Sequence, residues 1–188
     1  MANAFIILSA RRIFIMATNP EILIKEKPII VPKEGRPGIG LNAAKALSST
    51  NKSSIPVLAH AAGGARIYID KSADLSVAQK IIINAKTSKP AACNSIDTIV
   101  VHQDIAVAFI PSITTALSKV SVEITTNDDW DKEFLGLALN IKVVQNVDEA
   151  ISFINEHSKK HSEGIVASDT EAIEQFTNSV DAAALFIN

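Results

Sequence analysis

Apolar residues along this 188-residue chain occur in two patterns, short continuous runs and stripes with helical spacing. Runs of β-branched and apolar residues are typical of buried strands, and stripes that recur every three or four positions predict helices. The runs cover residues 5–8, 13–16, 28–32, 55–58, 65–69, 97–102, 120–125, 141–144, 164–167 and 182–187, and the stripes cover 42–47, 75–85, 104–119, 148–158 and 170–178. This alternation predicts an α/β fold, a mostly parallel sheet with helices on both faces.

Composition and charge exclude several classes of function. The chain is 47% hydrophobic with a net charge of −2, which is typical of a globular protein and gives no electrostatic footprint for nucleic acid. Its apolar runs are shorter than the ~20 residues that cross a bilayer, so we expect no membrane partner. The start of the chain lacks the pattern of a secretory signal. One cysteine and scattered histidines give neither a disulfide nor metal-ligand spacing, so we expect no metal and a reducing compartment.

The single cysteine, Cys93, lies in a polar loop and not in an apolar run. Residues 87–90 (Thr-Ser-Lys-Pro) end the preceding helical stripe, and lysines stand nearby. Adjacent cations favour the thiolate, the form in which cysteine acts as a nucleophile. The alternative is that Cys93 is a small buried hydrophobic residue. From composition and loop context alone, both interpretations remain open.

The residues around Cys93 form a specific motif. They are Asn84-Ala-Lys-Thr-Ser-Lys-Pro90, then Cys93-Asn94, then Asp97-Thr-Ile-Val-Val-His102. This motif resembles the nucleophile segment of gamma-glutamyl phosphate reductase, also called glutamate-5-semialdehyde dehydrogenase, a family of the aldehyde dehydrogenase superfamily. The resemblance extends from about residue 29 to 188 and implies an aldehyde dehydrogenase-like nucleophile domain. Residues 1–27 do not resemble the family, and we expect two short buried strands there.

The resemblance implies an activity and roles for particular residues. The reaction would be the NADP-dependent reduction of gamma-glutamyl phosphate to glutamate 5-semialdehyde and phosphate, a cytoplasmic step of proline biosynthesis. Cys93 would attack the acyl phosphate and form a thioester, with its backbone N–H as an oxyanion donor and Asn94 beside it. Lys86 and Lys89 would neutralise phosphate or carboxylate charge. Lys89 replaces the usual arginine of the family, and Asp97 replaces the usual glutamate.

Two further residues have both a functional and a structural interpretation. His60 stands in an alanine-histidine pair before a glycine turn, as in the family, and could line the site, although a lone histidine after a strand is more often structural. Glu133 follows Trp130 as does the glutamate that, across the superfamily, holds the nicotinamide ribose of the cofactor. Without the resemblance, residues 128–133 would be a solvated acidic turn. No glutamate base for water activation stands near His60, which suits a phosphate-releasing enzyme.

Family members are more than twice as long as this chain, and their earlier part builds the cofactor-binding domain. We therefore predict an unassigned segment at 1–27, a catalytic nucleophile domain at 28–188, and a largely absent cofactor-binding domain. The implied partners are gamma-glutamyl phosphate and glutamate kinase. We also expect the chain to self-associate, because the surfaces that would meet a cofactor domain should be apolar. Two alternatives remain: a non-catalytic remnant that binds a partner, or an unrelated thiol hydrolase with His60 or His102 beside Cys93.

Overall fold

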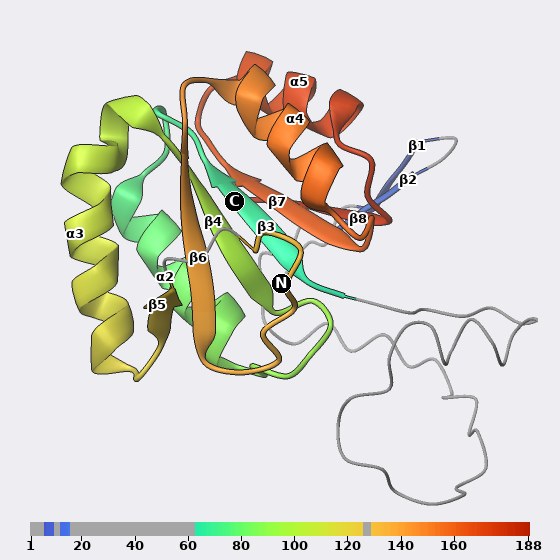
Figure 1. Cartoon of the computed structure of the whole chain (residues 1–188). Coiled ribbons are helices and arrows are strands. Elements are labelled where there is room, and N and C mark those ends of the chain that lie inside the picture. Colours follow the sequence, from blue (N-terminus) through green and yellow to red (C-terminus); the bar gives the residue numbers. More distant parts are fainter. Residues whose placement is uncertain (1–5, 10–11, 16–62, 126–128) are drawn as a thin grey trace, which may run out of the picture.

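The structure, a computed structural model, describes residues 6–9, 12–15, 63–125 and 129–188 (Figure 1). Its strands are β1 (Ile6–Ser9), β2 (Arg12–Ile15), β3 (Ala65–Ile69), β4 (Ile96–His102), β5 (Glu123–Thr125), β6 (Ala138–Val144), β7 (Ser162–Val166) and β8 (Ala184–Ile187). Its helices are α2 (Leu75–Thr87), α3 (Gln103–Lys119), α4 (Val147–His157) and α5 (Thr170–Ser179). The strands form one sheet in the order β1-β2-β8-β7-β3-β4-β6-β5, in which only β1 and β2 pair antiparallel.

The sheet is covered by helices on both faces (Figure 1). Side chains alternate across a strand, so successive residues of β3 enter different cores. Ile67 and Ile69 pack with residues of α2 and α3, whereas Tyr68 packs with residues of α4 and α5. The predicted fold class, a mostly parallel sheet between two helical layers, is therefore confirmed.

Short polar side chains set where most of the helices begin. Asp74 accepts hydrogen bonds from the N–H groups of Ser76 and Val77 at the start of α2. Asn146 and Asp169 cap α4 and α5 in the same way. Such side chains satisfy the unpaired N–H groups of a first helical turn. Asp74, Asn146 and Asp169 therefore fix the starts of α2, α4 and α5.

The boundaries of some strands differ from the prediction. The strand predicted at 120–125 begins only at Glu123, because the end of α3 extends into this stretch: the Val120 N–H donates to the Leu117 and Ser118 carbonyls, and Ser121 has a φ of 60°. β6 instead begins at Ala138, three residues before the predicted start. The elements predicted at 28–32, 42–47 and 55–58 lie outside the described residues.

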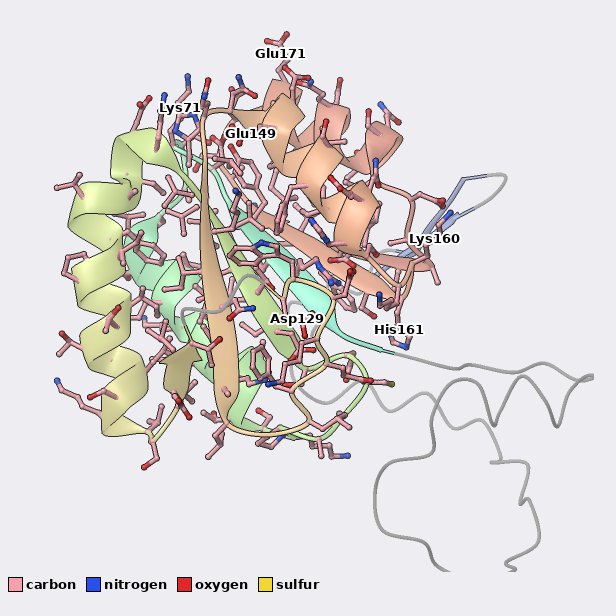
Figure 2. The ribbon with its side chains drawn as sticks, viewed as in Figure 1. Lys71, Asp129, Glu149, Lys160, His161 and Glu171 are labelled. Carbon is pink, nitrogen blue, oxygen red and sulfur yellow. The ribbon has the colours of Figure 1, made fainter. Side chains whose placement is uncertain are left out.

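The loops that precede β3, β4, β6 and β7 lie on one side of the sheet, at the amino-terminal ends of these parallel strands. Residues 63–64, 93–95, 129–137 and 158–161 come directly before β3, β4, β6 and β7. Figure 2 shows Asp129 and His161 towards this edge and Lys71 at the opposite one. The sheet therefore gathers the predicted nucleophile loop and the predicted cofactor-binding segment on the same side. None of the helices in the described ranges is long and apolar enough to cross a membrane.

Candidate active site

Cys93 is carried by a tight loop between α2 and β4. The Ala92 N–H donates to the Lys89 carbonyl (3.0 Å), and the Ser95 N–H donates to the Ala92 carbonyl (2.9 Å). These two successive turns leave Cys93 exposed, with a free thiol. Of the two interpretations of this residue, the buried hydrophobic one is therefore wrong. An exposed thiol on a backbone-bonded loop is accessible to a substrate and held in a defined place.

Two glycines form the floor beneath Cys93. The Gly64 N–H donates to the Cys93 carbonyl (2.8 Å), and Gly64 has a φ of +106°, which side chains rarely tolerate. A Cβ atom on Gly63 would lie 2.4 Å from the Cys93 oxygen and 2.6 Å from its Cβ. Only glycine allows so close an approach of the two backbones. The glycine turn noted in the sequence thus supports the predicted nucleophile directly.

Replacement of Gly63 by alanine tests this support. Because the new methyl group meets backbone atoms of Cys93, we expect a loss of about 1–3 kcal/mol in the free energy of unfolding and a changed alkylation rate of Cys93. Urea unfolding followed by Trp130 fluorescence and iodoacetamide kinetics measure both. Gly164→Ala is the matched control, since its Cβ would make ordinary contacts at 3.5 Å or more. Equal behaviour of the two variants would contradict the role of Gly63.

Lys86 lies inside the protein behind the nucleophile loop. Its Nζ is fully buried and donates to the Ile96 carbonyl (2.9 Å) and to Asp97 Oδ1 (3.2 Å). Burial lowers the pKa of Lys86 and raises the pKa of Asp97, and each charge opposes the shift of the other. A direct contact between Lys86 and substrate stays a prediction. The observed geometry gives this lysine an internal partner, Asp97, that links the end of α2 to the start of β4.

Glu133 lies on a segment that is attached to the same carboxylate. The Phe134 N–H donates to Asp97 Oδ1 (3.3 Å), and Arg66 Nη2 donates to the Trp130 carbonyl (2.9 Å). Glu133 is half-buried. The burial of Asp97 is the main cause of its raised pKa, and the negative charge of Glu133 raises that pKa further. The structure therefore brings the predicted ribose-binding residue and the predicted nucleophile loop to a common point.

Arg66 and Glu163 are two buried charged residues that the sequence analysis missed. They are 2% and 1% exposed, and Arg66 Nη1 lies 3.7 Å from Glu163 Oε1. Glu163 also accepts hydrogen bonds from the Arg66 backbone N–H (2.7 Å) and from Ser158 Oγ (2.6 Å). A charged residue in a strand that is covered on both faces needs a buried partner. The charged residues in and beside the apolar runs 65–69 and 164–167 could therefore have been recognised as a buried pair. Arg66 Nη1 and Asp97 Oδ2 both lie within 4.0 Å of the position of a Cβ on Gly64, the residue whose N–H binds the Cys93 carbonyl.

A groove of about 760 Å³ runs beside α2, over β3, β7 and β8. Its lining includes Lys89 and Asn94, both exposed, and the apolar side chains of Ile67 and Val166. The structure therefore brings Lys89 and Asn94 together at an accessible surface, in contrast to Lys86. Their predicted roles towards substrate stay predictions.

Of the two histidines considered for the thiol hydrolase alternative, only His102 lies in the described residues, and its position does not support that alternative. His102 is the last residue of β4, and its Nδ1 accepts a hydrogen bond from the Asp104 N–H (3.1 Å) at the start of α3. Cys93 precedes the same strand, which spans about 20 Å. His102 is therefore at the wrong end of β4 to act on Cys93. His60 lies outside the described residues.

The opposite edge of the sheet is closed. In doubly wound sheets, ligands usually bind at the carboxyl ends of strands where successive connections diverge, here between β3 and β7. The Asp70 N–H donates to the Val166 carbonyl (3.0 Å), and Ser72 Oγ accepts from the N–H groups of Ser168 and Asp169 (both 3.0 Å). These bonds join the loops that follow β3 and β7 at the position where such a ligand would bind.

The chain is similar in sequence to several known proteins. No protein family model matches the chain. Gamma-glutamyl phosphate reductase from Clostridium tetani is 36% identical over 185 residues, which are 85% of this chain and 42% of the relative. The same enzyme from Listeria monocytogenes is 42% identical over 149 residues, 71% of this chain and 36% of the relative. The chain is homologous to part of gamma-glutamyl phosphate reductase. The resemblance predicted from the Cys93 motif is thus confirmed.

Solved structures agree with this assignment. The crystal structure of gamma-glutamyl phosphate reductase from Thermotoga maritima matches with a TM-score of 0.73 at 37% identity, over 77% of this chain and 38% of that one. An NADP-dependent glyceraldehyde-3-phosphate dehydrogenase from Bacillus halodurans, complexed with NADP, matches with a TM-score of 0.68 at 14% identity, over 78% and 42%. The second similarity shows the shared aldehyde dehydrogenase fold alone. The chain spans about two fifths of the length of the reductases it matches.

Proposed function

We propose that this chain is the nucleophile-bearing part of an NADP-dependent gamma-glutamyl phosphate reductase of proline biosynthesis, acting in the cytoplasm. The observation that carries the proposal is the placement of Cys93, an exposed thiol held against Gly63 and Gly64. It occurs in a chain homologous to reductases of this name. Asn94 follows Cys93 on the same loop, and Lys89 lies beside it on the accessible groove.

The first step is the transfer of the glutamyl group to Cys93. The thiolate attacks the acyl carbon of gamma-glutamyl phosphate, a carbon–sulfur bond forms, and the carbon–oxygen bond to phosphate breaks. Phosphate leaves with the bonding electron pair and is stabilised by the positive charge of Lys89. The backbone N–H of Cys93 donates to the oxygen of the acyl group as negative charge develops on it. The product is a thioester on Cys93.

The second step is the reduction of that thioester. When bound, a reduced nicotinamide cofactor supplies a hydride to the acyl carbon. Glu133 fits the role of accepting hydrogen bonds from the ribose hydroxyls, because it is a half-buried carboxylate on a segment tied to Asp97. The tetrahedral adduct on Cys93 would then collapse: the carbon–sulfur bond breaks, glutamate 5-semialdehyde leaves, and the sulfur keeps the bonding electron pair. Cys93 thus returns to the thiolate form that begins the first step.

Partners follow from the same chemistry. Acyl phosphates hydrolyse readily, so we propose glutamate kinase, which would make the substrate, as an associating enzyme. We also propose self-association of the chain. The apolar side chains of Leu135, Leu137 and Val143 support it, since each is about two fifths exposed on or near β6.

The decisive experiment is acylation of the purified chain. Gamma-glutamyl phosphate is generated with glutamate kinase and ATP, and intact-protein mass spectrometry detects a glutamyl adduct. We expect one adduct per chain, located on Cys93 and absent from Cys93→Ser. Gamma-glutamyl hydroxamate should also slow the alkylation of Cys93 by iodoacetamide. A chain that is folded by circular dichroism but shows neither adduct nor protection would not carry a working nucleophile site by itself. It would be a remnant or would need a further domain, and the function proposed for this chain would be lost.

A further inference from the structure

We propose that Asp97 is a positioning residue that fixes the nucleophile loop and the Glu133 segment in one relative geometry. Its importance for turnover rests on the proposed function, in which both segments serve a single reaction. The geometry itself is independent of that function. It is argued from the contacts that Asp97 makes to each segment.

Asp97 is bound to the nucleophile loop from two sides. It is the second residue of β4, four positions after Cys93, and it is 2% exposed. Its Oδ1 accepts a hydrogen bond from Lys86 on α2, the helix that leads into the loop. Its Oδ2 would lie 3.0 Å from a Cβ on Gly64, the residue whose N–H binds the Cys93 carbonyl. Asp97 therefore binds the end of the helix that leads into the loop, and it packs against Gly64, which binds the loop backbone.

The same carboxylate is bound to the other segment. Oδ1 accepts a second hydrogen bond, from the Phe134 N–H directly after Glu133. At its other end the segment is held by Arg66, which donates to the Trp130 carbonyl. Arg66 pairs with Thr98 across β3 and β4, next to Asp97. The stretch from Trp130 to Phe134 is thus attached at both ends to buried charged residues of the neighbouring strands β3 and β4.

The proposed reaction requires a fixed distance between the nucleophile loop and the Glu133 segment. Hydride transfer requires the donor and the acyl carbon on Cys93 to approach within ~3–3.5 Å, and a misplacement of ~1 Å costs on the order of a hundredfold in rate. Apolar residues of similar size often replace a buried ion pair without loss of stability, so the fold alone does not demand this one. Asp97 Oδ2, moreover, is buried without a hydrogen-bond partner in the described part of the chain.

The chain provides two unique probes for a test. Cys93 is the only cysteine and Trp130 the only tryptophan. An aminonaphthalene acceptor attached to Cys93 receives energy from Trp130, and time-resolved fluorescence gives the distribution of distances between the loops. We expect a single narrow distribution in the unchanged chain and a shifted or broadened one in Asp97→Asn. Asp97→Glu, which keeps the charge, should restore the narrow distribution.

Controls keep the outcome decisive. Asp104→Asn, at an exposed position on α3, should leave the distribution narrow. If Asp97→Asn fails to fold, Lys86→Met/Asp97→Leu replaces the pair by apolar residues and should broaden the distribution in a folded chain. A folded variant without the Asp97 carboxylate, but with the original distribution, overturns the proposal. Because energy transfer needs no turnover, that result leaves the acylation of Cys93 untouched, and a failure of acylation leaves the coupling untouched.

Discussion

Replacement of Glu163 by glutamine is expected to stabilise the chain by about 3 kcal/mol at about pH 8 and to change little at about pH 4. Burial raises the pKa of Glu163 to about 7, against the opposing attraction of Arg66. The unfolded chain releases this proton at about pH 4.5, whereas the folded chain keeps it until about pH 7. Stability present at low pH is therefore lost as the pH rises through this window. Glutamine, which does not ionise, avoids the loss.

The contact between Arg66 and Glu163 would suggest the opposite sign, a stabilising ion pair. Burial dominates because Glu163 is only 1% exposed and the guanidinium nitrogen is 3.7 Å away, beyond hydrogen-bond distance. Urea unfolding curves from about pH 4 to about pH 8 measure the difference between the two chains. Glu156→Gln, at an exposed position on α4, is the matched control and should show no such trend. A variant less stable than the original chain at high pH would reverse our conclusion on this pair.

The apolar pattern was sufficient to predict the strands and helices that carry the site. β-branched runs placed β3, β4 and β7, and the stripe before Asn84 placed α2, because burial on both faces of a parallel sheet leaves a strong local signal. Cys93 could also be placed on a loop, since Pro90 and its polar neighbours end the helix. Local chemistry was therefore sufficient to place the candidate nucleophile, Cys93, on an exposed loop.

The partners of buried charges could not be predicted in this way. Arg66 and Glu163 are 97 positions apart and meet only because β7 returns to the other side of β3, a crossover that no local pattern specifies. Lys86 and Asp97 are 11 positions apart, but the motif suggested that Lys86 faces substrate. The burial of both followed only from the packing of α2 on β4. The sequence thus showed where these charged residues stand along the chain, but not which residues they contact.

Replacement of Lys86 by methionine is expected to lower the free energy of unfolding by about 3–5 kcal/mol at neutral pH. The change leaves the Asp97 carboxylate and the Ile96 carbonyl in the interior without the hydrogen bonds that Lys86 Nζ donates to them. The Arg66 guanidinium makes no such hydrogen bond to Glu163, so the two substitutions have opposite signs. Methionine fills a similar volume, so the loss arises from the charge and not from a cavity. Lys159→Met removes one of two ion-pair contacts of Asp131, at an exposed site, and should cost only about 0–1 kcal/mol. Urea unfolding followed by Trp130 fluorescence compares the two variants.

The dependence on pH identifies the cause. Burial already raises the pKa of Asp97 with Lys86 beside it, and removal of Lys86 raises that pKa further. The folded variant then retains a proton that the unfolded chain releases above about pH 4, so the destabilisation grows with rising pH and is smallest at about pH 4. A loss of stability that is the same at all pH values would instead point to faulty packing around methionine.

The double variant Lys86→Met/Asp97→Leu separates stability from positioning. With both charges gone, we expect most of the stability to return, because no ionised group is left unpaired in the core. The links from Asp97 to Phe134 and to the end of α2 are nevertheless lost. A double variant as unstable as Lys86→Met would mean that the pair is needed for folding itself. A stable double variant with a loosened Glu133 segment would mean that the pair serves the geometry between Cys93 and Glu133.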